Sequence, residues 1–90
     1  MESNTGVRDA VSHVPAIRDI LARHGGLATD VYRLANDDDL YLAGLTSLAT
    51  VNLMLALENH FDIEFPDSML SRRTFASLEA IAEAVAELAR

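Results

Sequence analysis

Apolar residues near the start of the chain recur every three or four positions, which is the spacing of one face of a helix. These residues are Val7, Val11, Val14, Ile17 and Leu21. Pro15 lies inside the stripe, and a proline within a helix removes one hydrogen bond and clashes with the preceding turn, at about 3 kcal/mol. The pattern therefore predicts a helix over Ala16–Arg23, which Gly25 stops. Residues Val7–Val14 join it only if the helix kinks at Pro15 instead of starting there.

A second helix is predicted over Ser47–Phe61, where apolar residues form two stripes. Thr46 or Ser47 can serve as its N-cap, because a side-chain oxygen there accepts a hydrogen bond from an exposed backbone amide. One stripe consists of Leu53, Leu57 and Phe61. The neighbouring stripe consists of Leu48, Val51 and Leu55. One stripe is enough to bury a helix in a small bundle, so the other is either a wider core face or an exposed patch for a partner.

Residues 26–44 form a long connection that contains the acidic run Asp37–Asp39. We expect a loop, with room for one helical turn, that apolar anchors fix to the core. These anchors are Leu27, Val31, Leu34, Leu40, Leu42 and Leu45.

The last third of the chain continues the helical pattern. Ile63 and Phe65 are expected to fill the core from a loop, and Pro66 fits the first turn of a short helix over Asp67–Leu70. The final predicted helix is Phe75–Leu88, capped by Thr74, and its stripe consists of Phe75, Leu78, Ile81, Val85 and Leu88. The result is an all-α bundle with three main helices and one short third helix. We expect residues 1–6 to be disordered and residues 7–90 to form a single domain.

Composition narrows the classes of function. The chain has 90 residues, a net charge of −7 and no Cys. The acidity argues against a nucleic-acid binder, and the lack of Cys excludes disulfides and thiolate chemistry. The N-terminus is polar, unlike a signal peptide, and the apolar run Leu53–Leu57 is far shorter than the roughly 20 residues of a membrane span. We therefore expect a cytoplasmic protein that binds neither nucleic acid nor membrane.

The side chains offer no familiar catalytic set. His13, His24 and His60 lie on separate segments without metal-ligand spacing, so no metal site is predicted. The Asp37–Asp39 run fails as a calcium loop, because Tyr41 and the residue after it stand where an oxygen ligand and a glycine are needed. A hydrolase would need a base beside Ser47, but its neighbours in the sequence are Thr46 and Leu48. We predict that the protein is not an enzyme.

Ser47 has two interpretations. It is either an ordinary capping serine or a modification site. A phosphodiester on its hydroxyl would face unpaired amides and the positive end of the helix dipole, a contribution of roughly 0.3–1 kcal/mol.

The motifs around this serine resemble the acyl carrier protein family. The stretch Asp39–Leu48, which ends in Gly44-Leu45-Thr46-Ser47-Leu48, resembles the family's Gly-x-Asp-Ser-Leu pattern, and Phe61–Asp67 resembles its Phe-x-Ile-x-Ile/Phe-Pro pattern. The resemblance extends from Ile17 to the C-terminus. It implies a four-helix bundle whose serine, here Ser47, receives a 4'-phosphopantetheine arm from coenzyme A through a phosphopantetheinyl transferase. The arm then holds an acyl group as a thioester.

Two departures from the family concern its contacts with other proteins. The usual Asp before the serine is Thr46 here, so a standard transferase is expected to act poorly. The recognition helix of fatty-acid carriers is rich in Glu, whereas this chain retains only Glu58 among the matching positions. Docking to basic fatty-acid synthase enzymes should therefore be weaker. The other matching positions are Ala49, Asn52, Asn59 and His60.

A narrower resemblance is to the small bacterial aminoacyl carrier proteins, and it extends to Arg72-Arg73-Thr74-Phe75-Ala76-Ser77. It implies loading by an ATP-dependent amino acid:[carrier protein] ligase similar to a truncated seryl-tRNA synthetase. The docking surface implied in this way consists of Thr46, Leu48, Val51, Leu55, Arg72 and Arg73. The two arginines either contact the partner or the arm's phosphate, or are simply solvated. We expect a monomer.

Two alternatives stay open. One is an acyl or peptidyl carrier of fatty-acid, polyketide or non-ribosomal peptide synthesis. The other is a helical interaction module without a cofactor, which would dock through its exposed leucines and valine.

Overall fold

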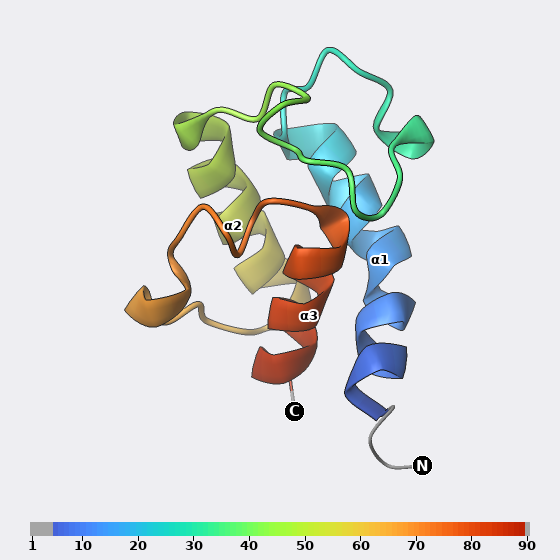
Figure 1. Ribbon diagram of the computed structural model, residues 1–90. Helices are drawn as coiled ribbons and strands as arrows, with labels where there is room; N and C mark the ends of the chain where they lie inside the picture. Colours follow the sequence, from blue (N-terminus) through green and yellow to red (C-terminus); the bar gives the residue numbers. More distant parts are fainter. Residues whose placement is uncertain (1–4, 90) are drawn as a thin grey trace.

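The computed structural model describes residues 5–89, with side chains described from Ala10 onward. In this part of the chain there are three α-helices and no strand: α1 (Thr5–His24), α2 (Ser47–Phe61) and α3 (Leu78–Leu88). α1 runs in one direction, and α2 and α3 both run back in the other (Figure 1). The beginnings of α2 and α3 therefore lie at the same end of the molecule as the end of α1. The predicted all-α bundle is confirmed, and α2 has the predicted bounds.

α1 is a single helix that continues through Pro15. Apolar side chains on both sides of the proline are buried, including Ala10, Val14 and Ile17, and α1 packs more extensively against α3 than against α2. This burial offsets the local cost of the proline. The predicted helix over Ala16–Arg23 is confirmed, and of the two alternatives that Pro15 left open, a start near the proline is excluded because Val7–Val14 are helical as well. Val11 is 60% exposed and does not belong to the buried stripe. The Val7 side chain lies outside the described residues, as do residues 1–4 of the expected disordered N-terminus.

α1 ends at His24, directly before Gly25, the stop that the sequence predicted. The Gly25 amide donates to the Leu21 carbonyl at 2.7 Å. A Cβ atom on Gly25 would lie 2.6 Å from Leu21 Cδ1 and 2.7 Å from the Leu21 carbonyl oxygen. Only glycine therefore fits this turn without a shift of the helix end.

The connection between α1 and α2 holds a 3-10 turn, Val31–Arg33, and is fixed to the bundle at several points. Val31, Leu40 and Leu45 are buried, as predicted, but Leu42 is 85% exposed and is not an anchor. The Arg18 guanidinium, which the sequence patterns did not single out, holds the connection by its backbone. It donates to the carbonyl oxygens of Val31 and Leu34 at 2.8 Å each.

The segment between α2 and α3 differs from prediction at two points. The short third helix is only a 3-10 turn, Asp67–Met69. α3 begins at Leu78 instead of Phe75, and its N-cap is Ser77, whose Oγ accepts from the Ala80 amide at 3.0 Å. The Thr74 cap was therefore a wrong prediction. The reason is that the Ala76 carbonyl accepts from the Leu40 amide at 2.7 Å, which ties this segment to the first connection.

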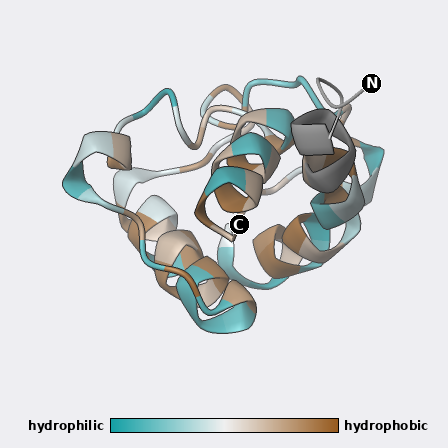
Figure 2. Ribbon diagram, turned by 90° about the horizontal axis from the view of Figure 1, so that it is seen from below, coloured by the Kyte–Doolittle hydropathy of each residue, from teal (hydrophilic) through white to brown (hydrophobic). Residues whose placement is uncertain are grey.

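The core lies between the apolar faces of the three helices, which turn toward one another in the end-on view (Figure 2). Phe65 and Phe75 complete it from the α2–α3 segment, with ring centroids 5.4 Å apart. The largest fully buried side chains are Ile17, Leu21, Leu40, Leu53, Leu57, Leu78, Ile81 and Val85. None of the helices in residues 5–89 has the length and apolar character needed to cross a membrane.

Candidate functional site

Ser47 is the first residue of α2, and it does not cap the helix. The N-cap is Thr46, whose Oγ1 accepts from the Ala49 amide at 3.1 Å. Ser47 is exposed. No hydrogen bond within residues 5–89 involves its hydroxyl. The interpretation of Ser47 as a capping serine is therefore wrong, and its hydroxyl remains available to another molecule.

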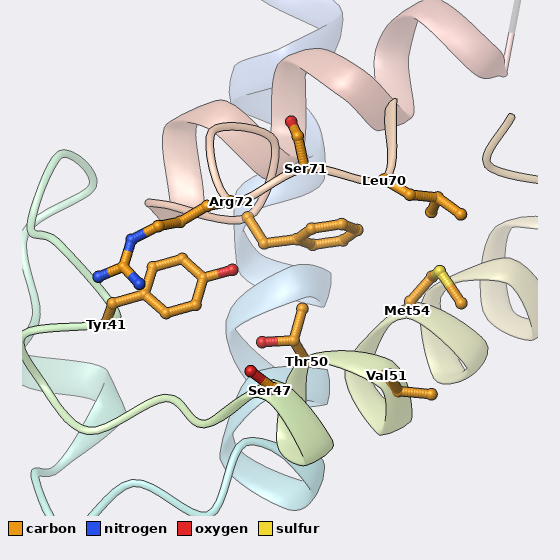
Figure 3. Close-up of a pocket in the computed structure, with 9 residues that line it drawn as sticks. Tyr41, Ser47, Thr50, Val51, Met54, Leu70, Ser71 and Arg72 are labelled. Atoms are coloured by element: carbon orange, nitrogen blue, oxygen red, sulfur yellow. The ribbon is translucent and has the colours of Figure 1, made fainter. Parts of the chain in front are cut away.

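A cavity of about 310 Å³ opens beside Ser47, between the first turns of α2 and the segment before α3 (Figure 3). Its walls are mainly apolar. The lining residues are Tyr41, Ser47, Thr50, Val51, Met54, Leu70, Ser71, Arg72 and Phe75. An extended, partly apolar group attached to the serine hydroxyl could therefore lie along this cavity.

Arg72 lies across the cavity from the start of α2. Its Cζ is 4.1 Å from the centroid of the Tyr41 ring, which is a cation–π contact. Arg73, although adjacent in sequence, does not line this cavity. It borders a separate hollow with Glu83 and Glu87 on α3. The structure thus separates the two arginines that the sequence motif grouped together.

The two apolar stripes of α2 face in the predicted directions. Leu53 and Leu57 are fully buried, and Phe61 is partly buried against the core. The second stripe is exposed, with Leu48 at 74%, Val51 at 47% and Leu55 at 54%. These three side chains define an apolar strip along α2, beginning next to Ser47.

A further hollow, of about 470 Å³, lies between α1 and α2 beside Leu55. Among the side chains that the structure describes, no carboxylate lines it. The polar residues on its walls are Arg23, His24, Asn52, Asn59 and His60. The side of α2 that borders the apolar strip is therefore neutral to basic, in contrast to the overall acidity of the chain.

A protein-family model described as "Phosphopantetheine attachment site" matches residues 15–85. The chain belongs to this family of carrier proteins. Phosphopantetheine is accordingly its cofactor, and the surroundings of Ser47 suit that group. They offer an exposed hydroxyl, a mainly apolar cavity next to it, and a guanidinium on the opposite wall. Among the side chains that the structure describes, from Ala10 to Ala89, no group of three or more metal-ligating residues could hold a metal ion.

Relatives of this carrier protein include aminoacyl carriers. It is 55% identical over 69 residues to the aminoacyl carrier protein of Agrobacterium fabrum, which covers 77% of this chain and 83% of that protein. It is 45% identical over 53 residues to the D-alanyl carrier protein of Streptococcus mutans, covering 58% of this chain and 67% of that one. The resemblance to aminoacyl carrier proteins is confirmed.

A solved structure shows the same fold. It is the crystal structure of an engineered Bradyrhizobium japonicum glycine:[carrier protein] ligase complexed with a carrier protein from Agrobacterium tumefaciens and AMP. The matching chain has a TM-score of 0.78 and 53% identity, and the match covers 80% of this carrier protein and 96% of that chain. The carrier-type fold predicted from the sequence is thereby confirmed.

Most predicted site residues lie together on α2. Thr46 caps the helix, Ser47 and Leu48 begin its first turn, and Val51 and Leu55 continue along the exposed face. Arg72 joins them across the cavity, but Arg73 does not. Tyr41 was missed as a site residue, and its contact with Arg72 has no signal in the spacing of the sequence because the two residues lie on different connections.

Proposed function

We propose that this carrier protein holds an aminoacyl group as a thioester on a phosphopantetheine arm attached to Ser47. The observation that carries the proposal is the Ser47 hydroxyl, which is exposed and free of the capping role because Thr46 performs it. When bound, the arm supplies the thiol that the chain itself lacks. The protein contributes the attachment point and a recognisable surface around it.

The loading partner that fits this surface is an ATP-dependent amino acid:[carrier protein] ligase. The support is the similarity to a carrier protein solved with a glycine:[carrier protein] ligase, together with the exposed strip of Leu48, Val51 and Leu55 beside Ser47. We propose that the ligase docks on this strip and on Thr46. The arm is first attached by a phosphopantetheinyl transferase.

Several properties follow from this role. The chain performs no catalysis itself, because the ligase and the transferase supply the reacting groups. Residues 7–90 act as one carrier domain, and the working form is a monomer. Since ATP and coenzyme A are the sources of the energy and of the arm, we propose a cytoplasmic location.

Mass spectrometry tests the attachment site. The wild-type chain is treated with coenzyme A and a broad-specificity transferase, next to Ser47→Ala and Ser71→Ala. Ser71 lines the same cavity as Ser47, so its variant is a matched control. We expect one phosphopantetheine on the wild type and on Ser71→Ala, and none on Ser47→Ala. An adduct on Ser47→Ala, or none on the wild type, rejects the proposal.

A second experiment separates aminoacyl loading from the alternatives. The modified protein is incubated with a glycine:[carrier protein] ligase, ATP and glycine or alanine, and its intact mass is measured. A thioester-linked amino acid is expected. Loading with fatty acyl groups but never with amino acids would instead indicate an acyl carrier. Full binding of a partner by the unmodified chain would indicate an interaction module without a cofactor.

A further inference from the structure

Among the described residues, the Arg72 side chain has no charged partner. Its exposed guanidinium lies over the Tyr41 ring at 4.1 Å. In the part of the chain that the structure describes, this ring contact is the one interaction of the guanidinium itself. The lack of a partner is notable in a chain with 14 acidic and 7 basic residues. A guanidinium stacked on a ring keeps its N–H edges free, and these edges suit the oxygens of a phosphate group.

The backbone holds the Arg72–Tyr41 pair in place. The Leu40 amide donates to the Ala76 carbonyl at 2.7 Å, which joins the two connections next to this pair. The Leu40 side chain, on the first connection, is fully buried, and the Phe75 side chain, on the second, is 2% exposed. The ring that positions the guanidinium is therefore part of a fixed framework.

Ser47 and Arg72 border the same cavity. Figure 3 shows the Arg72 and Tyr41 side chains together on the side nearer Ser47, while Leu70 and Met54 lie toward the opposite side. A phosphate on the serine oxygen would enter the same cavity that the Arg72 side chain borders. Arg73 borders another hollow, together with two glutamates.

We propose that Arg72, positioned by Tyr41, binds the phosphodiester that links the arm to Ser47. This inference rests on the proposed attachment at Ser47 and adds a residue that fixes the base of the arm. The first turn of α2 contributes to the same site, since its amides and dipole favour an anion. The arm is then directed from its base along the cavity, instead of rotating freely about the serine side chain.

Phosphorus NMR tests the contact directly. The wild type, Arg72→Ala, Arg72→Lys and Arg73→Ala are each converted fully to the phosphopantetheine form, as verified by intact mass. We expect the phosphodiester resonance of Arg72→Ala to move away from the wild-type position and to sharpen, because the group becomes mobile. Arg73→Ala should retain the wild-type resonance. Arg72→Lys should fall between the two, since an ammonium keeps the charge but loses the planar fork.

Two further measurements exclude a merely structural role. The Arg72 Nε–Hε signal should shift when the unmodified protein is converted to the phosphopantetheine form, and the Arg73 signal should not. Salt at about 1 M, where the screening length is about 3 Å, should move the wild-type phosphorus resonance toward that of Arg72→Ala. Unmodified Arg72→Ala should melt at most a few degrees below the wild type, because the exposed side chain contributes only its cation–π contact with Tyr41.

The outcomes distinguish this inference from the proposed function. If the wild type never acquires the arm at Ser47, the proposed function itself fails. If all four proteins carry the arm but share one phosphorus resonance, only the role of Arg72 is overturned. A shift in Arg73→Ala that equals the shift in Arg72→Ala would also overturn it, because a general effect of positive charge would then explain the data. The Tyr41→Leu variant should reproduce part of the Arg72→Ala shift.

Discussion

At the start of α2, two adjacent hydroxyl residues have different tasks. Thr46 lies outside the helix in an extended conformation and caps it through Oγ1, whereas the Ser47 side chain is left to the solvent. An oxygen that caps the helix accepts a hydrogen bond from an amide, which lowers its nucleophilicity toward an incoming group. The threonine therefore explains how the serine can be both at a helix end and available.

The cap can be tested by substitution. Thr46→Ala removes the acceptor for the Ala49 amide and should lower the free energy of unfolding by about 0.5–2 kcal/mol, measured by urea denaturation. Thr46→Asp keeps a capping oxygen and should stay close to the wild type. Because it also restores the residue that the wider family usually has before the serine, we expect faster modification by a standard transferase. Equal stability of all three proteins would show that the cap contributes nothing.

At the scale of elements, the sequence predicted α2 better than α3. The bounds of α2 followed from a hydroxyl cap and two complete stripes, both of which are local signals. The start of α3 was placed too early because Phe75 continues the apolar spacing of that helix. In the structure, Phe75 is buried from the preceding turn, where hydrogen bonds to the first connection hold the backbone. Contacts between segments that are distant in sequence decided this boundary, and periodicity does not contain them.

The two faces of α2 give opposite predictions for two leucines. Leu57 is fully buried and Leu48 is 74% exposed. Leu57→Ala should lower the free energy of unfolding by about 2–5 kcal/mol, a large share of the roughly 5–15 kcal/mol of a whole domain. Leu48→Ala should leave melting nearly unchanged and weaken ligase binding roughly fivefold to thirtyfold. Calorimetric melting and titration of the ligase measure the two effects, and the reverse pattern would mean that the faces are misassigned.

Pro15 gives a prediction for α1. The side chain is exposed, so its replacement disturbs no packing, but its missing N–H and its ring strain the helix. Pro15→Ala should raise the free energy of unfolding by up to about 3 kcal/mol, reduced by about 0.4–1 kcal/mol because proline also restricts the unfolded chain. Urea denaturation measures the change. Pro66→Ala, at a position outside α1 with an extended backbone, is the control and should not be stabilising.

For the molecule as a whole, the decisive features of the site come from three separate parts of the chain. Tyr41 lies in the first connection, Ser47 begins α2 and Arg72 precedes α3. The family motif identified Ser47. The sequence also placed Arg72 and Arg73 together in one predicted docking surface. Neither the contact of Arg72 with Tyr41 nor the separation of Arg73 was predictable, because both depend on how the two connections cross. The hydrogen bonds from Arg18 to the backbone of the first connection were missed for the same reason.

The distribution of charge yields a last prediction. The net charge is −7, yet the polar side chains described around the hollow beside the apolar strip of α2 are two asparagines, two histidines and an arginine, with no carboxylate among them. Docking through this face should depend mainly on apolar contact, so long-range attraction to a basic partner should contribute little. We expect the association rate with the ligase to fall only slightly between about 0.05 M and 0.5 M salt, measured by stopped flow.

Adding two glutamates, Asn52→Glu and Asn59→Glu, changes this face without touching the core and should change the salt dependence. A steep fall in rate for the wild type would mean that the acidic residues elsewhere on the molecule steer the partner.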